Sequence, residues 1–161
     1  MTQSRSLMLF RGLPGSGKTT MARAFVKGLN TSLLPWERIT TAHYEDDDFF
    51  CKTGKYCYEP ALVHAAHLEC LLKTQRAMQE GTQIIVVANT FVRLWELDPY
   101  HKLATRYNYP VQEIIVTGNF PNQHGVPVES IARMQRHFQM RPKQYILGDP
   151  LVNPADRILG T

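Results

Sequence analysis

The sequence has few cysteines and no long hydrophobic run. Its three cysteines form no C-x-x-C pair, and an odd number cannot all pair within one chain. No apolar stretch approaches the roughly 20 residues that a membrane span requires, and nothing before Leu7 resembles a secretory signal. We therefore expect a protein without disulfides or membrane segments, located in the reducing environment of the cytoplasm.

Internal repeats and low-complexity tracts are also missing. Hydrophobic residues make up 43% of the 161 residues, which is enough for one domain with its own core. The formal net charge of +4 favours a polyanionic partner such as nucleic acid. Acidic residues gather at 45–48, whereas basic residues gather at 133–143, so we expect a catalytic acid set apart from an anion-binding surface.

A glycine-rich segment, "GLPGSGKT" at residues 12–19, follows an apolar run and precedes an amphipathic pattern. It matches G-x-x-x-x-G-K-T, in which glycines allow backbone N–H groups to surround phosphate. We expect Lys18 to contact the β- and γ-phosphates of ATP and the Thr19 hydroxyl to bind Mg²⁺. The residues predicted to contact the nucleotide are Gly12, Leu13, Pro14, Gly15, Ser16, Gly17, Lys18, Thr19 and Thr20.

Strand and helix patterns alternate along the rest of the chain. Strands are predicted at 7–10, 38–42, 82–90 and 111–118, and helices from residue 18 and at 59–81, 94–108 and 126–138. The helix at 59–81 has Leu62, Ala66, Leu68, Leu72 and Met78 available for its buried side. This alternation predicts an α/β fold of the P-loop NTPase type, with a parallel sheet covered by helices on both faces.

Three polar segments follow the ends of predicted strands: the glycine loop, Asp46–Asp48, and Asn89 with Thr90. Because ligands bind beyond the carboxyl ends of such strands, these segments should line one crevice. A carboxylate of "EDDDFF" can orient a substrate hydroxyl and accept its proton, and the adjacent Phe49 and Phe50 can stack on a base. The alternative interpretation of this acidic run is a solvated turn.

Taken together, the motifs resemble a known family. In order they are "GLPGSGKTTMAR", "EDDDFF", "GKYCYEPALVHAAHLEC", "VVANTFVRLWELDPYHKLA" and "NQHGVPVESIARM". This order is similar to that of the P-loop polynucleotide kinases and their short kinase-like relatives. The resemblance implies that Asp47 is the general base toward the acceptor hydroxyl, with Asp48 beside it. Lys18 is then the second catalytic residue.

Three positions depart from the pattern of that family. Ala88 stands where such kinases often have an Asp before Asn-Thr, and Pro121 stands where the lid commonly supplies an Arg. Phe50 replaces an Arg that holds substrate phosphate in some polynucleotide kinases, and an aromatic ring there suits a base. Without the lid arginine, His124, Arg133 or Arg136 must meet the charge of the transferring phosphate. The residues expected to contact the substrate are Asp48, Phe49, Phe50, Asn89, Thr90, Arg133 and Arg136.

The resemblance implies an ATP- and Mg²⁺-dependent kinase acting on nucleic acid, with DNA as the first candidate. The acceptor is either a 5′-hydroxyl or the hydroxymethyl group of 5-hydroxymethyluracil, as in related bacteriophage enzymes. Two alternatives remain open: a kinase for a small metabolite or nucleoside, and a nucleotide-binding switch or adaptor without phosphoryl transfer. Residues 1–139 are expected to form the kinase domain, and residues 140–161 a tail packed on it.

Overall fold

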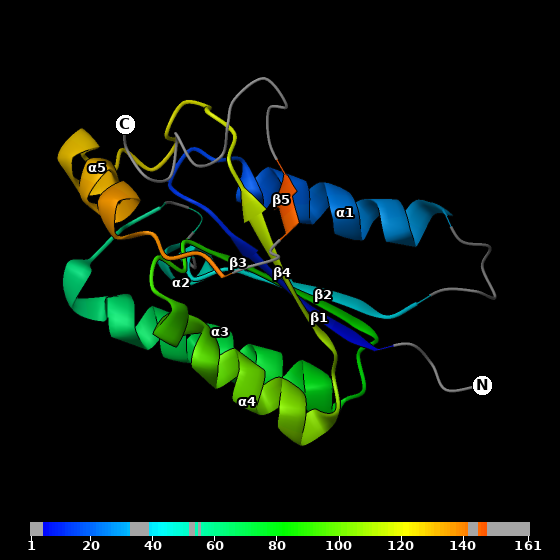
Figure 1. Cartoon of the computed structure of the whole chain (residues 1–161). Helices are drawn as coiled ribbons and strands as arrows, with labels where there is room; N and C mark the ends of the chain where they lie inside the picture. Colours follow the sequence, from blue (N-terminus) through cyan, green and yellow to red (C-terminus); the bar gives the residue numbers. More distant parts are fainter. Residues whose placement is uncertain (1–4, 33–38, 52–53, 55, 142–144, 148–161) are drawn as a thin grey trace.

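A parallel sheet of five strands forms the centre of the molecule (Figure 1). The computed structural model describes residues 5–32, 39–51, 54, 56–141 and 145–147. The strands are β1 Ser6–Arg11, β2 Thr41–Tyr44, β3 Ile84–Asn89, β4 Val111–Val116 and β5 Tyr145–Leu147. They lie in the order β2-β3-β1-β4-β5, and every pairing is parallel. The predicted parallel α/β fold is therefore confirmed.

Helices cover both faces of this sheet. Helix α1 (Lys18–Ser32) lies on one face, and α3 (Val63–Gln79) and α4 (Asp98–Tyr107) lie on the other (Figure 1). Successive residues of β1 point to opposite faces, so Met8 packs with α1 while Leu7 packs with the α3 and α4 side. A central strand that is buried on both faces explains the continuous apolar run in the sequence.

The shorter elements connect these layers to the edge where the strands end. They are α2 (Asp47–Phe50), the 3₁₀ turns η1 (Pro60–Leu62) and η2 (Leu94–Leu97), and α5 (Val128–His137). The predicted break near Pro99 is the junction of η2 and α4, where proline is tolerated in the first helical turn. Helix α5 begins directly after Pro127, as predicted, and stands apart from the two helical layers (Figure 1).

Two strands differ from the sequence-based expectation. Strand β2 was expected at 38–42, but pairing with β3 begins at Thr41 and continues to Tyr44, so the acidic segment follows directly. Residues 145–147 form strand β5 beside β4, whereas no strand was predicted in that segment. Three residues carry no periodicity of their own, so only the exposed edge of β4 makes them a strand. Residues 142–144 and 148–161 of the predicted tail lie outside the described residues.

The buried side of α3 is also different from the predicted one. Leu62, Leu68 and Leu72 are 39%, 48% and 53% exposed, so their assignment to the core is wrong. Ala66 and Met78 are buried, as predicted. Small side chains allow a helix to approach the sheet closely, which leaves the leucines on the outer surface. The buried residues of α3 are Ala66, Cys70, Thr74, Ala77 and Met78.

A fully buried arginine ends the central strand. The Nε and Nη2 atoms of Arg11 donate to the carbonyl oxygen of Phe91 at 3.1 and 2.7 Å, and Nη2 also donates to that of Gln139 at 2.8 Å. Its Nη1 lies 3.9 Å from Oε2 of Glu113, and its guanidinium lies over the ring of Phe138. Burial lowers the pKa of Arg11 to about 10, against the opposing effect of Glu113. Arg11 therefore ties β1 to β4, to the segment after β3 and to the segment after α5.

Replacing Arg11 by Met should destabilise the fold strongly. The substitution leaves two carbonyl groups without the guanidinium donors and takes one cation away from Glu113, which keeps its contacts with His101 and Arg141. Losing these buried polar contacts costs about 3 kcal/mol. Urea denaturation followed by circular dichroism measures this loss. The matched control is Lys102→Met, which removes a cation from the exposed surface of α4. Equal unfolding midpoints for the two variants would contradict the assigned role of Arg11.

Candidate active site

The glycine loop connects the end of β1 to the start of α1. Gly15 and Gly17 have φ angles of +79° and +85°, which other residues rarely adopt. A Cβ atom on Gly12 would come within 2.4 Å of Oγ of Ser16, so the loop is also closely packed. Oγ of Ser16 is buried without a hydrogen-bond partner in the described part of the chain. An unpaired hydroxyl beside the N-terminus of a helix fits a bound phosphate group.

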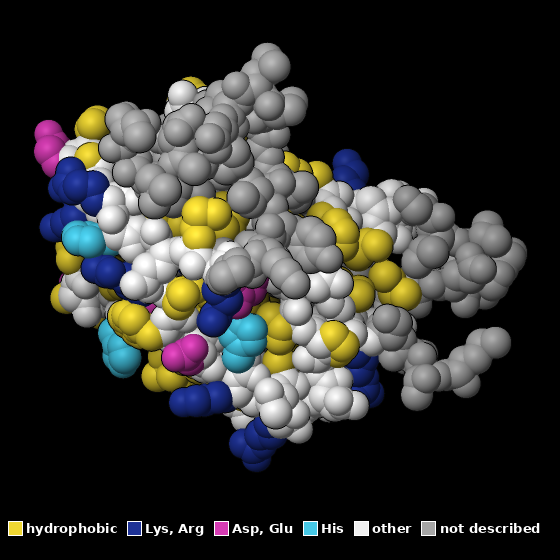
Figure 2. Space-filling view, in the orientation of Figure 1, with side chains coloured by type: hydrophobic (Ala, Val, Ile, Leu, Met, Phe, Trp, Pro, Cys, Tyr) yellow, Lys and Arg dark blue, Asp and Glu magenta, His cyan; other side chains and the backbone are white. Residues whose placement is uncertain are grey.

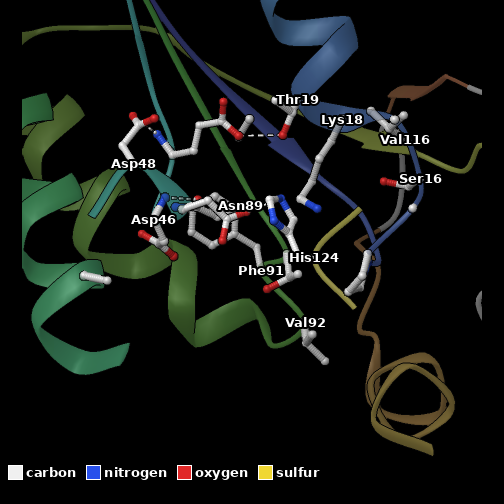
Figure 3. Close-up of a pocket in the computed structure, with 18 of the residues that line it drawn as sticks. Ser16, Lys18, Thr19, Asp46, Asp48, Asn89, Phe91, Val92, Val116 and His124 are labelled. Atoms are coloured by element: carbon white, nitrogen blue, oxygen red, sulfur yellow. Dashed lines mark hydrogen bonds and ion pairs between the residues drawn. The ribbon is translucent and has the colours of Figure 1, made fainter. Parts of the chain in front are cut away.

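The lysine and threonine of the loop face an acidic segment (Figure 3). Burial lowers the pKa of the Lys18 ammonium, and the carboxylates of Asp47, Glu45 and Asp46 oppose this shift. The Thr19 hydroxyl donates a 2.5 Å hydrogen bond to Oε2 of Glu45. The loop thus presents a half-buried lysine and a hydroxyl to the same side of the cavity, as the sequence predicts for a nucleotide site.

The acidic segment is held in place by the neighbouring strand and helix. The backbone N–H of Asp46 donates to Oδ1 of Asn89 at 2.8 Å, which continues the pairing of β2 with β3 through a side chain. Oδ2 of Asp46 pairs with Nδ1 of His67 on α3, and Oδ2 of Asp48 accepts the N–H of Glu45 at 3.2 Å. The segment is therefore an ordered part of the site and differs from the solvated turn considered above.

Asp47 points into the cavity with a separate partner for each oxygen. The hydroxyl of Tyr56 donates to Oδ1 at 3.2 Å, and Nε2 of His124 lies 3.3 Å from Oδ2. The rings of Tyr56 and His124 are also in contact, with centroids 4.3 Å apart. Burial, followed by the negative charge of Asp47, raises the pKa of Tyr56, so this hydroxyl stays a hydrogen-bond donor. Two neutral or cationic donors thus orient the predicted general base.

Asn89 and Thr90 have different positions at the end of β3. The side chain of Asn89 is 4% exposed, and its Nδ2 donates to Sγ of Cys70 at 3.6 Å while its Oδ1 accepts from Asp46. Asn89 therefore positions the acidic segment and also lines the cavity. Thr90 lines the cavity, and its carbonyl oxygen accepts the N–H of Gly12 at 3.3 Å.

The aromatic and basic residues that were predicted to contact the substrate are less closely grouped around the cavity than the residues described above. Phe50 is 7% exposed because it packs against Phe49, Tyr56 and Tyr58. Arg133 and Arg136 are exposed on α5, where basic side chains gather on the surface (Figure 2). Neither arginine is among the residues that line the cavity.

One cavity of about 1520 Å³ is lined by the glycine loop, the acidic segment, Asn89 and Thr90. Its nucleotide half is formed by the glycine loop, and its other half by α3, η2 and the segment after β3. We call the second half the acceptor compartment. Its lining includes Val63, Leu68, Leu71, Phe91 and Trp95.

Sequence reasoning assigned no individual role in the site to three of its residues. These are Glu45, Tyr56 and His67, which contact Thr19, Asp47 and Asp46 respectively. A usable signal for Glu45 was its place directly after a strand, at the edge where ligands bind. Tyr56 and His67 had no comparable signal, because their partners are set by the turn after α2 and by the position of α3.

The chain matches a known protein family. The family model described as "AAA domain" matches residues 7–118, which include the glycine loop, the acidic segment and strands β1 to β4. The chain belongs to this AAA domain family. Its fold is that of P-loop kinase-like proteins. Within the described ranges of this AAA domain, no helix has the length and apolar character needed to cross a membrane.

A relative and several solved structures share this AAA domain fold. NEDD4-binding protein 2 of Homo sapiens is 30% identical over 142 residues, which cover 83% of this chain and 8% of that protein. The chain thus spans a small part of this relative. Kti12 of Chaetomium thermophilum with ADP-AlF3 has a TM-score of 0.67 at 12% identity, with 94% of this chain and 95% of that chain covered.

Two further structures come from kinase and RNA repair proteins. APS kinase CysC of Mycobacterium tuberculosis, in complex with AMPPNP and APS, has a TM-score of 0.53 at 15% identity, with 96% and 94% of the two chains covered. A chain of the Pnkp1/Rnl/Hen1 RNA repair complex has a TM-score of 0.52 at 20% identity, with 84% of this chain and 38% of that chain covered. At these identities, the similarity establishes the fold alone.

The His67–Asp46 pair predicts a specific titration. The hydrogen bond to Asp46 raises the pKa of His67 above 6.5, against the effect of burial. A raised folded-state pKa stabilises the fold fully below 6.5, and this contribution is lost as the pH rises through the folded-state value. NMR titration should therefore show a lower pKa for His67 in Asp46→Asn than in the wild type. The matched control, His64→Gln, should leave the His67 titration unchanged, and an unchanged titration in Asp46→Asn would refute the pairing.

Proposed function

We propose that this protein is an ATP-dependent kinase that transfers the γ-phosphate to a hydroxyl group on nucleic acid, with DNA as the preferred substrate. The observation that carries the proposal is that Lys18 and Asp47 line one cavity, between the glycine loop and the acceptor compartment. A phosphate-binding cation and an oriented carboxylate in one cavity are what phosphoryl transfer to a hydroxyl requires.

The glycine loop supports the nucleotide half of this proposal. ATP bound with Mg²⁺ supplies the phosphoryl group, and the Thr19 hydroxyl is placed to hold the cation. Lys18 carries a charge that burial disfavours, so a phosphate group in contact with it regains the lost electrostatic stabilisation. The unpaired Oγ of Ser16 and the N–H groups at the start of α1 provide further donors.

Asp47 supports the transfer step. Its carboxylate orients the acceptor hydroxyl and takes up the hydroxyl proton as the phosphate is transferred. Tyr56 and His124 each engage one oxygen, which fixes the carboxylate and leaves lone pairs for the substrate. His124 also lies in the segment before α5, where a positive charge can compensate the transferring phosphate in place of the lid arginine that Pro121 replaces.

The acceptor compartment favours a hydroxyl carried by a base. Its apolar lining suits a flat heterocycle, and Trp95 and Tyr58 at the cavity are 68% and 56% exposed. Exposed aromatic rings can stack on bases, whereas Phe50 packs against Tyr58 from within the aromatic cluster. The basic surface of α5 with Arg133 and Arg136 suits the phosphates of a strand (Figure 2). These features support the hydroxymethyl group of 5-hydroxymethyluracil as the acceptor ahead of a 5′-hydroxyl.

Asp47→Asn should reduce phosphoryl transfer on the order of a hundredfold, because the amide accepts no proton. The affinity for ATP, measured by calorimetry, should remain within about twofold of the wild type, because Asp47 acts on the acceptor side. Asp98→Asn makes the same chemical change on the exposed start of α4 and should leave transfer unchanged. A variant Asp47→Asn with wild-type turnover would show that another group accepts the proton.

The acceptor can be identified with γ-labelled ATP. We expect label on DNA that contains 5-hydroxymethyluracil and has a blocked 5′ end, because the apolar lining of the acceptor compartment suits a base. Label on unblocked 5′ ends alone would refute the base-directed acceptor and retain the nucleic-acid kinase. Label on free nucleosides or small metabolites alone, or ATP binding without label on any hydroxyl, would refute the proposed function.

A further inference from the structure

The threonine of the glycine loop already has a carboxylate partner. Oγ1 of Thr19 donates to Oε2 of Glu45 at 2.5 Å, the contact marked by the dashed line at Thr19 in Figure 3. In P-loop phosphotransferases, the threonine or serine at this position and a carboxylate at a strand end together hold the divalent cation. The hydrogen bond therefore identifies Glu45 as a candidate for the second group.

The strand that neighbours the loop cannot supply this carboxylate. Its residue at the relevant level is Ala88, which is 2% exposed and has no side-chain oxygen. Strand β2 pairs in parallel with β3, and Tyr44 lies opposite Val87. The next residues of the two segments are Glu45 and Ala88, so Glu45 lies at the same height along the sheet as Ala88. Paired residues of parallel strands point to the same face, so Glu45 replaces the missing group from one strand farther away. The extra methylene of glutamate, compared with aspartate, helps to cover that distance.

The surroundings of Glu45 fix the orientation of its carboxylate. Its side chain is 4% exposed, and Oε1 accepts a 2.9 Å hydrogen bond from Nη2 of Arg23. Nε2 of His43 lies 3.7 Å from the same oxygen. Arg23 and the ring of His43 thus lie at Oε1, while Oε2 is directed to Thr19 and the cavity. One oxygen anchors the carboxylate, and the other faces the nucleotide side.

Two protein ligands are enough for a divalent cation that the phosphates of a nucleotide also bind. Among the described residues, no group of three or more His, Cys, Asp and Glu side chains is arranged to hold a metal ion. Mg²⁺ in phosphotransferases is bound by one or two protein groups together with phosphates and water. Thr19 and Glu45 meet this requirement.

We propose that Glu45, together with Thr19, holds the divalent cation of the bound cation–nucleotide complex, in place of the carboxylate that Ala88 lacks. The inference rests on the proposed function only for the binding of a nucleotide with its cation. It assigns Glu45 at the end of β2 as the cation-binding carboxylate of this chain.

Binding of Mn²⁺ to the complex of the full chain with AMPPNP tests this assignment by electron paramagnetic resonance. Glu45→Gln should weaken Mn²⁺ binding about tenfold or more, as expected for the loss of a group that fixes a metal. AMPPNP binding in the presence of EDTA should not change, because the loop itself is intact. Arg23→Gln removes the anchoring ion pair and keeps the carboxylate, so it should retain most of the Mn²⁺ affinity.

A rescue variant separates cation binding from a structural role. Glu45→Ala should lose Mn²⁺ affinity, and the double substitution Glu45→Ala with Ala88→Asp should regain it by returning a carboxylate to β3. Wild-type Mn²⁺ affinity in Glu45→Gln, an equal loss in Arg23→Gln, or weaker AMPPNP binding in EDTA would overturn the assignment. Because the measurement detects only bound cation and nucleotide, a failure to phosphorylate any hydroxyl would leave this result intact.

Discussion

The buried guanidinium of Arg11 is the interaction on which the geometry of the site depends. It stands at the end of the central strand, immediately before the glycine loop, and its donors reach the segments after β3 and after α5. An unpaired polar group in the protein interior raises the free energy of the folded state. Moving either segment would break these hydrogen bonds and is therefore unfavourable. The glycine loop therefore starts from a defined position relative to both Phe91, which lines the cavity, and the end of α5.

The parallel register of β2 and β3 is the second constraint on the site. It brings the four consecutive acidic residues 45–48 to one edge of the sheet, and the first three meet different environments. Glu45 turns to Thr19, Asp46 to His67, and Asp47 to Tyr56 and His124. A separate partner for each carboxylate offsets the repulsion that three adjacent negative charges would otherwise experience. In the proposed function, the acidic run serves the nucleotide, the scaffold and the acceptor in turn.

The fold is shared by proteins with different functions. The neighbouring structures include an APS kinase and a chain of an RNA repair complex, so the shared sheet and glycine loop do not define a substrate. In this chain, α3 contributes Leu68 to the acceptor compartment because its small residues face the sheet instead. The packing of the small α3 residues against the sheet therefore also leaves apolar side chains of α3 to line the acceptor compartment.

Local chemistry was enough to predict the parallel strands, the glycine loop and the helix that follows it, because each depends on a short run of neighbouring residues. The resemblance to kinases added Asp47 and the segments around it, and the structure brings these together without testing their roles. The face of α3, strand β5, the burial of Arg11 and the Thr19–Glu45 contact could not be predicted in this way. Each depends on which distant segment lies alongside: the sheet beneath α3, the edge of β4, the carbonyl groups around Arg11, and the register of β2 on β3. Hydrophobic periodicity reports the spacing of apolar residues within one segment. The segment that packs or pairs with it is determined by the fold of the whole chain.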